Sequence, residues 1–259
     1  MSELTPNEQR HLTSLEEIAN CPVLDADCGD TDRLTPPLEA LPPLGAFNEK
    51  WADLVLDEDI RSCGLRFIDF GCRWSTRAGE DDEDDDVAYD DEEEAADNSI
   101  LHTRELPEIS GEFFLRPFHD ILSQPDGPAR GADTEFQRQF LSELRVMDQT
   151  PRSGAGMLTY IRLKPGLGPL EVWYSDVADI GASPYPPGFI KMDITYREYL
   201  DAILLTKGTY GWQYLYTDIS LARGFGEIRG YLEGMLELFP EIFPDHDYSP
   251  LVERLEARL

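Results

Sequence analysis

Basic residues are scarce in this chain. Its 259 residues include 22 Lys and Arg against 52 Asp and Glu, which gives a formal net charge of −30. Binding to nucleic acid or to an anionic membrane depends on Lys and Arg side chains, so the composition argues against both kinds of partner. A surface this acidic attracts basic proteins and speeds their encounter, although solubility alone also accounts for such a charge.

Long apolar runs are missing as well. No segment approaches the ~20 consecutive apolar residues that a membrane-spanning helix needs. Residues 1–20 are polar and acidic and contain no apolar stretch of the kind found in secretory signals. We therefore expect a soluble, cytoplasmic protein.

Cysteine is rare, and the four cysteines are widely spaced: Cys21, Cys28, Cys63 and Cys72. Their spacing matches none of the compact zinc patterns, in which two ligands are separated by about two to four residues. In a large cytoplasmic chain, cysteines are expected to be free thiols. We predict four free thiols; a metal site built from all four cysteines is the alternative.

Motifs of the common enzyme classes are absent from the sequence. It has no nucleophile elbow, no phosphate-binding Lys loop and no paired-His zinc helix. Residues 224–230 resemble a dinucleotide-binding loop only superficially, because the third glycine comes one position late. Residues 25–30 hint at a calcium loop, but their glycine is not in the sixth position, and we interpret them as a turn.

One pair of residues has the types needed for catalysis. His119 and Asp120 follow a predicted strand and match a general acid–base pair. Neither a nucleophile nor a set of metal ligands stands beside them in the sequence, so a structural role is the stronger interpretation. We predict that the protein is not an enzyme and has neither a cofactor nor a bound metal.

The strongest local signals lie in residues 193–218. Thr195 and Glu198 have the spacing of a capping box, and the apolar residues that follow recur at helical spacing. Gly208 supplies a left-handed stop after this helix. The aromatic run behind it is centred on Trp212, which we predict to be a core residue.

Other segments show helix and strand patterns along the whole chain. Capping boxes begin at Thr5 and Thr134, and period-two alternation marks the strands. The predicted elements are helices over residues 5–21, 47–56, 133–147, 225–239 and 249–259, and strands over residues 65–70, 100–105, 112–118, 157–163, 170–174 and 189–192.

The predicted helix over residues 225–239 contains three glycines four residues apart. They are Gly226, Gly230 and Gly234. Each interior glycine weakens a helix by about 1 kcal/mol relative to Ala. We expect the close approach of a neighbouring backbone to compensate for this loss.

Residues 80–97 form an acidic run of thirteen acids without a single base. Such a composition cannot bury enough apolar surface to fold, so we predict an unfolded loop. Because predicted strands lie on both sides, the run is expected to be an insertion within one sheet. Its acids are the candidate partner-binding residues: Asp81, Asp82, Glu83, Asp84, Asp85, Asp86, Asp90, Asp91, Glu92, Glu93 and Glu94.

The whole chain, residues 1–259, is predicted to form a single α+β domain. Residues 1–60 are expected to be a helical and proline-rich N-terminal extension of that domain. The charge is uneven, since residues 1–156 carry −24 and residues 157–259 carry −6.

The C-terminal third carries a pattern of two strands, a short strand and a Tyr-x-x-Tyr-Leu helix, here Tyr196, Tyr199 and Leu200. With the aromatic tail of residues 206–216, this pattern resembles the SUKH superfamily, the Smi/Knr-homology proteins. The resemblance covers residues 157–243. Residues 1–110 depart from the family pattern, because the usual early Leu-Pro-x-x-Tyr-x-x-Phe-Leu helix is not found and the acidic insertion is unusual.

This resemblance implies an α+β fold with a central, mostly antiparallel sheet packed by helices. It also implies a cytoplasmic immunity protein that binds and neutralises a bacterial toxin, often a nuclease or a deaminase, by direct contact. The acidic charge of the chain fits a basic toxin of this kind. The alternative is a non-enzymatic regulatory or scaffold protein of the same fold that holds another partner.

Overall fold

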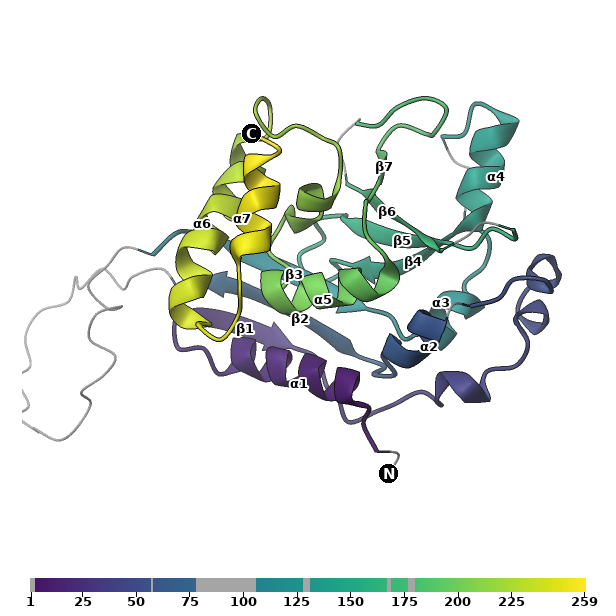
Figure 1. The fold of residues 1–259 in the computed structure, drawn as a ribbon, viewed down its shortest axis with the longest axis horizontal. Helices are drawn as coiled ribbons and strands as arrows, with labels where there is room; N and C mark the ends of the chain where they lie inside the picture. The colour runs from purple at the N-terminus through teal and green to yellow at the C-terminus, as the bar shows by residue number, and fades with distance from the viewer. Residues whose placement is uncertain (1–2, 57, 78–105, 128–130, 167–168, 177–179) are drawn as a thin grey trace, which may run out of the picture.

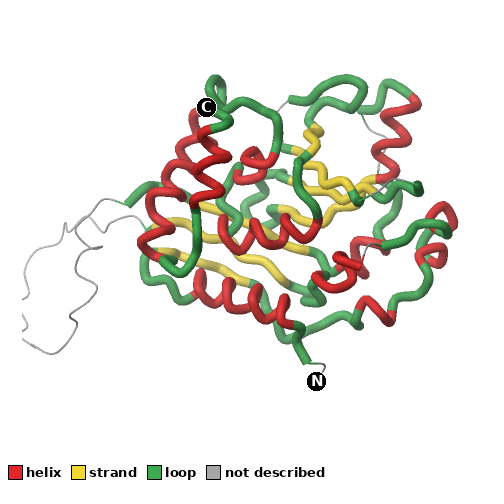
Figure 2. Tube along the Cα trace, in the orientation of Figure 1, coloured by secondary structure: helices red, strands yellow, loops and turns green. Residues whose placement is uncertain are grey.

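A computed structural model describes residues 3–56, 58–77, 106–127, 131–166, 169–176 and 180–259. In this part of the chain, helices pack against one open sheet of seven antiparallel strands (Figure 1 and Figure 2). The predicted α+β fold class is confirmed.

The sheet is a meander, in which strands that follow one another along the chain lie side by side. The strands are β1 Leu24–Cys28, β2 Phe70–Thr76, β3 Ser110–Leu115, β4 Leu144–Gln149, β5 Leu158–Arg162, β6 Glu171–Ser175 and β7 Phe189–Lys191. Only one register position, Leu115 opposite Asp148, joins β3 to β4. The two halves of the sheet therefore meet at a narrow seam.

Most helices cover one face of the sheet. The helices are α1 Pro6–Ala19, α2 Glu58–Cys63, α3 Phe118–Ser123, α4 Glu135–Glu143, α5 Tyr196–Thr206, α6 Gly226–Ile242 and α7 Ser249–Glu256. Helices α1, α5, α6 and α7 gather on the same side of the strands (Figure 1). Helix α4 lies on the other face, where Phe140 packs edge-to-face on Trp173 of β6 with ring centroids 4.7 Å apart.

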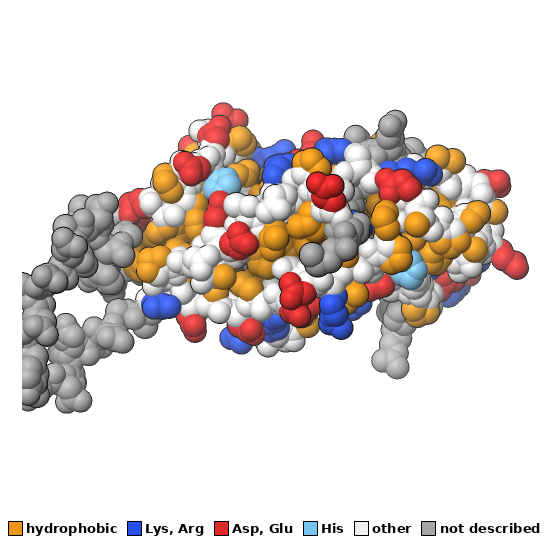
Figure 3. All heavy atoms as spheres, turned by 90° about the horizontal axis from the view of Figure 1, so that it is seen from below, with side chains coloured by type: hydrophobic (Ala, Val, Ile, Leu, Met, Phe, Trp, Pro, Cys, Tyr) orange, Lys and Arg blue, Asp and Glu red, His pale blue; other side chains and the backbone are white. Residues whose placement is uncertain are grey.

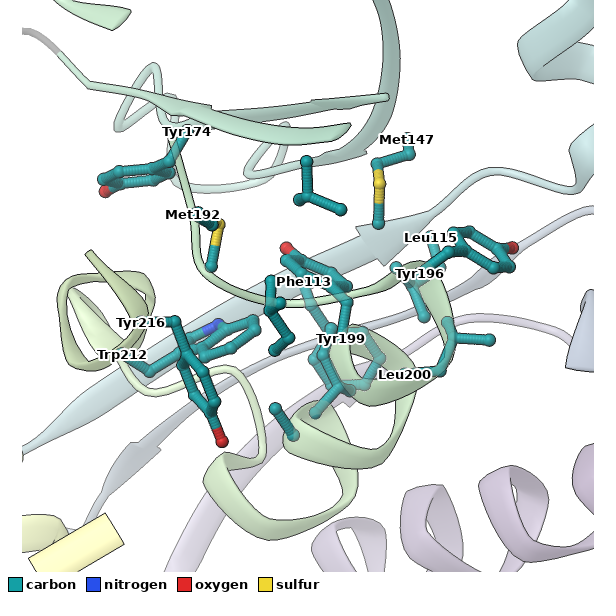
Figure 4. Packing of buried hydrophobic residues seen from close by; sticks show 14 of the residues in the cluster. Phe113, Leu115, Met147, Tyr174, Met192, Tyr196, Tyr199, Leu200, Trp212 and Tyr216 are labelled. Atoms are coloured by element: carbon teal, nitrogen blue, oxygen red, sulfur yellow. The ribbon is translucent and has the colours of Figure 1, made fainter. Parts of the chain in front are cut away.

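The main core lies between the sheet and α5. Thr195 and Glu198 form the predicted capping box, and the boxes at Thr5 and Thr134 are confirmed as well. Side chains from the strands meet those of α5 and of the short 3-10 helix η5, Trp212–Tyr216 (Figure 4). Trp212 is fully buried, as predicted for a core residue.

The end of α5 differs from the prediction. Gly208 adopts the predicted left-handed conformation, with φ of 73°, but Lys207 before it is already left-handed, with φ of 50°. Its side chain is completely buried, and its ammonium group donates to Ser14 at 2.7 Å and to Glu17, both in α1. This ion pair holds the lysine in a conformation that is costly for a residue with a Cβ.

Three predicted elements have wrong boundaries. The helix predicted over residues 133–147 ends at Glu143, where the chain turns directly into β4, because its apolar spacing continues across the change of structure. The strand predicted over residues 65–70 begins only at Phe70. Residues 47–56 form a 3-10 turn at Glu49–Trp51 instead of a helix, and Val55 is 80% exposed.

Residues 25–30, which we interpreted as a turn, belong mainly to the edge strand β1. Asp25 and Asp27 point to solvent, while Leu24 is buried. Antiparallel strands can face water on one side, so acids are tolerated at alternate positions. The interpretation as a turn is therefore wrong.

Cys28 and Cys72 form a disulfide, so the prediction of four free thiols is wrong for this pair. They occupy opposite register positions of β1 and β2, which bring together residues 44 apart in sequence. Cys21 and Cys63 are not part of a disulfide, so the prediction of thiols is confirmed for this pair, and both are buried. The disulfide also excludes a metal site made of all four cysteines, and no cluster of potential metal ligands occurs among the residues described.

The glycines of α6 do not meet a neighbouring backbone, so that prediction is wrong. Around Gly226 and Gly230, a Cβ atom would have nothing within 4 Å. At Gly234, a Cβ would lie 2.6 Å from Cγ2 of Ile109 and 3.0 Å from Cβ of Pro107. Packing therefore requires a glycine only at Gly234, and the close neighbours there are side chains.

The acidic run and the strand predicted over residues 100–105 lie outside the described residues. Strands β2 and β3 on either side of that segment pair directly, from Phe70 opposite Leu115 to Ser75 opposite Ser110. The run is thus inserted between two paired strands of one sheet, as predicted. Over the part of the chain that is described, none of the helices has the length and apolar character needed to cross a membrane.

Candidate functional site

The eleven acids predicted to contact a partner lie in residues 81–94, outside the described residues. The chain leaves the sheet at the end of β2 and returns at the start of β3. Asp25 of β1, which lies opposite Ser75, and Glu108 are exposed near these points. The structure therefore gives the attachment of the acidic run but does not test its contacts.

A second feature is the proline-rich surface, which we define as residues 34–55. Apart from three short 3-10 turns, η1 Leu38–Ala40, η2 Leu44–Ala46 and η3 Glu49–Trp51, this segment is irregular. Hydrophobic side chains reach the surface over the right-hand part of the molecule, where this segment lies (Figure 3). The partly buried ones are Leu34, Leu38, Leu41, Leu44 and Phe47.

Acids flank this surface. Five acids and two bases are exposed within residues 30–55. The acids are Asp30, Asp32, Glu39, Glu49 and Asp53, and the bases are Arg33 and Lys50. Gathered hydrophobic side chains with a polar rim are typical of sites that bind other proteins. The segment contains four prolines, Pro36, Pro37, Pro42 and Pro43. They limit the backbone entropy that the segment loses on binding.

His119 and Asp120, the predicted acid–base pair, lie at the edge of the proline-rich surface. Nδ1 of His119 is 3.5 Å from Oδ1 of Asp120, and both side chains are more than two-fifths exposed. The His119 ring packs edge-to-face on Phe47, with ring centroids 5.7 Å apart. An ion pair this exposed contributes little to stability.

Next to the proline-rich surface lies a cleft of about 590 Å³. Its walls come from residues 48–51, from Asp126, from one side of α4 and from residues 163–165. This size falls within the range of small-molecule sites. Six charged side chains line it: Lys50, Arg138, Lys164, Asp126, Glu135 and Glu143.

Asp126 is an acid of the cleft that bonds two cations. Nη2 of Arg145 donates to its Oδ1 at 2.7 Å, and Nζ of Lys50 lies 3.3 Å from its Oδ2. Burial raises the pKa of Asp126, but these two hydrogen bonds outweigh it and hold the pKa below its usual value. Asp126 is therefore ionised at neutral pH and shared between two cations.

Arg145 is almost completely buried beneath the cleft, with 1% of its side chain exposed. Its Nη1 donates to the carbonyl oxygens of Ser142 and Leu144, both at 2.8 Å. The guanidinium lies 4.8 Å from the centre of the Trp51 ring. These contacts fix a positive charge directly behind Asp126.

A second ionic network runs beside the cleft. Nη2 of Arg162 lies 2.7 Å from Glu143, and its Nη1 lies 3.0 Å from Glu171. Nζ of Lys191 lies 2.6 Å from the other oxygen of Glu171. The network joins α4 to β5, β6 and β7, and its two cations balance its two anions.

The core contains one buried acid at the seam of the sheet. Oδ1 of Asp148 accepts from the backbone N–H of Phe114 and of Gln149, both at 2.8 Å, and its Oδ2 accepts from the Tyr199 hydroxyl at 2.7 Å. Burial raises the pKa of Asp148 to about 6, although these hydrogen bonds oppose the shift. Asp148 thus replaces missing strand pairing between β3 and β4, where a bulge interrupts β4.

Comparison with protein-family models, with curated proteins and with solved structures gives no match to this chain. The resemblance to the SUKH superfamily therefore remains a prediction.

Sequence reasoning missed both the cleft and the proline-rich surface. The cleft brings together residues from four separate segments, and no motif links them. In the sequence, the segment that forms the proline-rich surface shows only many prolines and little periodicity.

Proposed function

We propose that the protein is a non-catalytic binding protein of the immunity type that neutralises a basic protein toxin, of nuclease or deaminase kind, by direct contact. The observation that carries this proposal is the proline-rich surface, with partly exposed Leu44 and Phe47, largely exposed Val55 and acids around them. Interfaces obtain most of their affinity from a few anchor residues surrounded by contacts that exclude water, and Phe47 is the aromatic candidate for such an anchor.

The charge of the chain supports the same partner. A net charge of −30 steers a basic protein toward the surface, and the acidic run supplies thirteen of the acids. Steering acts mainly on the association rate and is screened by salt, with a Debye length of ~8 Å at physiological ionic strength. In this proposal the acidic run raises the association rate, and the proline-rich surface lowers the dissociation rate of the complex.

The proposal places the protein in the cytoplasm. In that reducing compartment, Cys28 and Cys72 are expected to be thiols. Precipitation of whole cells with acid, followed by alkylation of the denatured protein with a thiol reagent, measures their state. Complete protection of both residues from the reagent would place the protein in an oxidising compartment and contradict this part of the proposal.

The experiment begins with capture of the native partner and its purification. Phe47→Ala and Leu44→Asp are expected to speed dissociation of the complex, while Val252→Asp, a change at another exposed hydrophobic side chain on α7, leaves it unchanged. Replacing residues 80–97 by a Gly/Ser linker of equal length should slow association at low salt only. An acidic partner, or association that ignores salt, would refute the steering role.

Co-expression separates this function from its alternatives. If the protein is an immunity protein, it should rescue cells from its toxic partner without consuming any substrate. Binding without rescue favours a regulatory or scaffold protein of the same fold. Rescue that is lost in His119→Ala and tracks substrate turnover would show that the protein is an enzyme.

A further inference from the structure

The cleft beside the proline-rich surface has a local charge opposite to that of the protein. Lys50, Arg138 and Lys164 line it, and Arg145 and Arg162 bond directly to two of its acids. These five residues are a large share of the 22 Lys and Arg in the chain. Three acids line the cleft against its three lining cations, and Arg145 behind Asp126 adds a further positive charge, so the cleft is locally positive although acids dominate the sequence.

The ion pairs show which positive charge remains uncompensated. Asp126 is shared by Arg145 and Lys50, so this group of three carries one surplus positive charge. Glu135 pairs with Arg138 at 2.9 Å, but its side chain is 85% exposed, so water screens that pair strongly. Lys164 has no bonded partner among the described residues. Because Glu143 belongs to a balanced network, it does not cancel these charges.

Two of the three acids that line the cleft already accept hydrogen bonds from neighbouring side chains. Asp126 accepts from Arg145, Lys50 and Asn48, and Glu143 accepts from Arg162 and Gln139. Their oxygens are therefore already occupied. Lys50 and Arg138 keep N–H groups beyond those bonded to Asp126 and Glu135, Lys164 adds three more, and the Lys50 side chain is 70% exposed.

We infer that this cleft binds a small molecule through an oxyanion group, a phosphate or a carboxylate, held between Lys50, Arg138 and Lys164. Arg145, fixed below by Asp126 and Trp51, adds a buried positive charge that solvent screens poorly. A cleft of about 590 Å³ accommodates a body the size of a nucleotide or a tricarboxylate attached to that group. This inference is independent of the proposed function.

The test is an NMR titration of the full chain with inorganic pyrophosphate and, separately, with citrate, at constant ionic strength maintained with sodium chloride. Binding predicts saturable shifts of the backbone amides of Gln139, Ser142 and Lys164. Saturation by pyrophosphate alone assigns the site to phosphates, and saturation by citrate alone assigns it to carboxylates. The absence of saturable shifts at the cleft with either probe would overturn the inference.

Variants show whether the observed binding uses this cleft. Lys164→Ala and Arg138→Ala should each weaken binding roughly tenfold, since a hydrogen bond to a charged group is lost, and Lys164→Glu should abolish it. Arg223→Ala is the matched control, because Arg223 is an exposed base outside the cleft. Equal weakening by the control, or no weakening by the cleft variants, would show diffuse counter-ion binding and refute the proposal.

Discussion

Asp148→Asn tests the role of the buried acid at the seam of the sheet. The side chain of Asp148 is buried between β3, β4 and α5, and burial raises its pKa from 3.8 to about 6. In the unfolded chain the carboxyl group returns to its ordinary pKa. The native state therefore binds a proton more tightly, so this group favours folding below pH 4, and that contribution is lost as pH rises through 6.

The size of the effect follows from the shift. One pKa unit corresponds to about 1.4 kcal/mol, so the full shift represents about 3 kcal/mol, of which roughly 2 kcal/mol falls between pH 4 and pH 7. Asn does not ionise and keeps an oxygen that accepts from the N–H groups of Phe114 and Gln149. Its amide N–H can donate to the hydroxyl oxygen of Tyr199, whose own proton then remains directed to Thr159, 2.9 Å away.

The assay is urea unfolding of both proteins at several pH values from 4 to 8. Other titrating groups are shared, so they cancel in the difference between the two free energies of unfolding. The free energy of unfolding of Asp148→Asn, relative to that of the wild-type protein, should rise by roughly 2 kcal/mol as pH rises from 4 to 7. A difference that stays constant over this range would refute the reasoning, because it would mean that Asp148 keeps the same charge throughout.

Three further predictions concern stability. Trp212→Ala should lower the free energy of unfolding by about 3–5 kcal/mol, measured by denaturant; an unchanged midpoint with lost partner binding would make Trp212 an interface anchor. Replacing residues 80–97 by a short Gly/Ser linker should not lower Tm, and a large loss would mean that the segment packs against the fold. Reducing the Cys28–Cys72 bond should lower the free energy of unfolding by about 2–4 kcal/mol. The stability of a Cys28→Ser, Cys72→Ser double variant should not change with the reductant. If the reductant leaves the stability of the wild-type protein unchanged as well, the bond is not present.

Features set by neighbouring residues could be predicted from the sequence. The capping boxes at Thr5, Thr134 and Thr195 each depend on a side chain three positions away, and all three form. Trp212 was assigned to the core because a run of aromatic residues follows a helix stop. Both kinds of prediction are confirmed because no contact with a distant residue overrides the local sequence signal at these positions.

Features set by distant residues could not be predicted. The boundary at Leu144 was missed because the apolar pattern of α4 also suits β4, and only pairing with Arg162 selects the strand. The disulfide depends on the register of β1 against β2. The left-handed Lys207 depends on Glu17 in α1, and the cleft depends on four separate segments.

The meander order of the strands has a consequence for folding rate. Every strand pairs with its neighbour in sequence, and the pairings from β4 to β7 close short loops, which is entropically inexpensive. The connections from Cys28 to Phe70, from Thr76 to Ser110 and from Leu115 to Leu144 are far longer, and closing each of them costs about 2 kcal/mol more than closing a tight hairpin turn. Repulsion among the thirteen acids adds to that barrier at low ionic strength. Among the three long connections, the one between β2 and β3 holds the acidic run, so the pairing of β2 with β3 should be the step of folding that salt accelerates most.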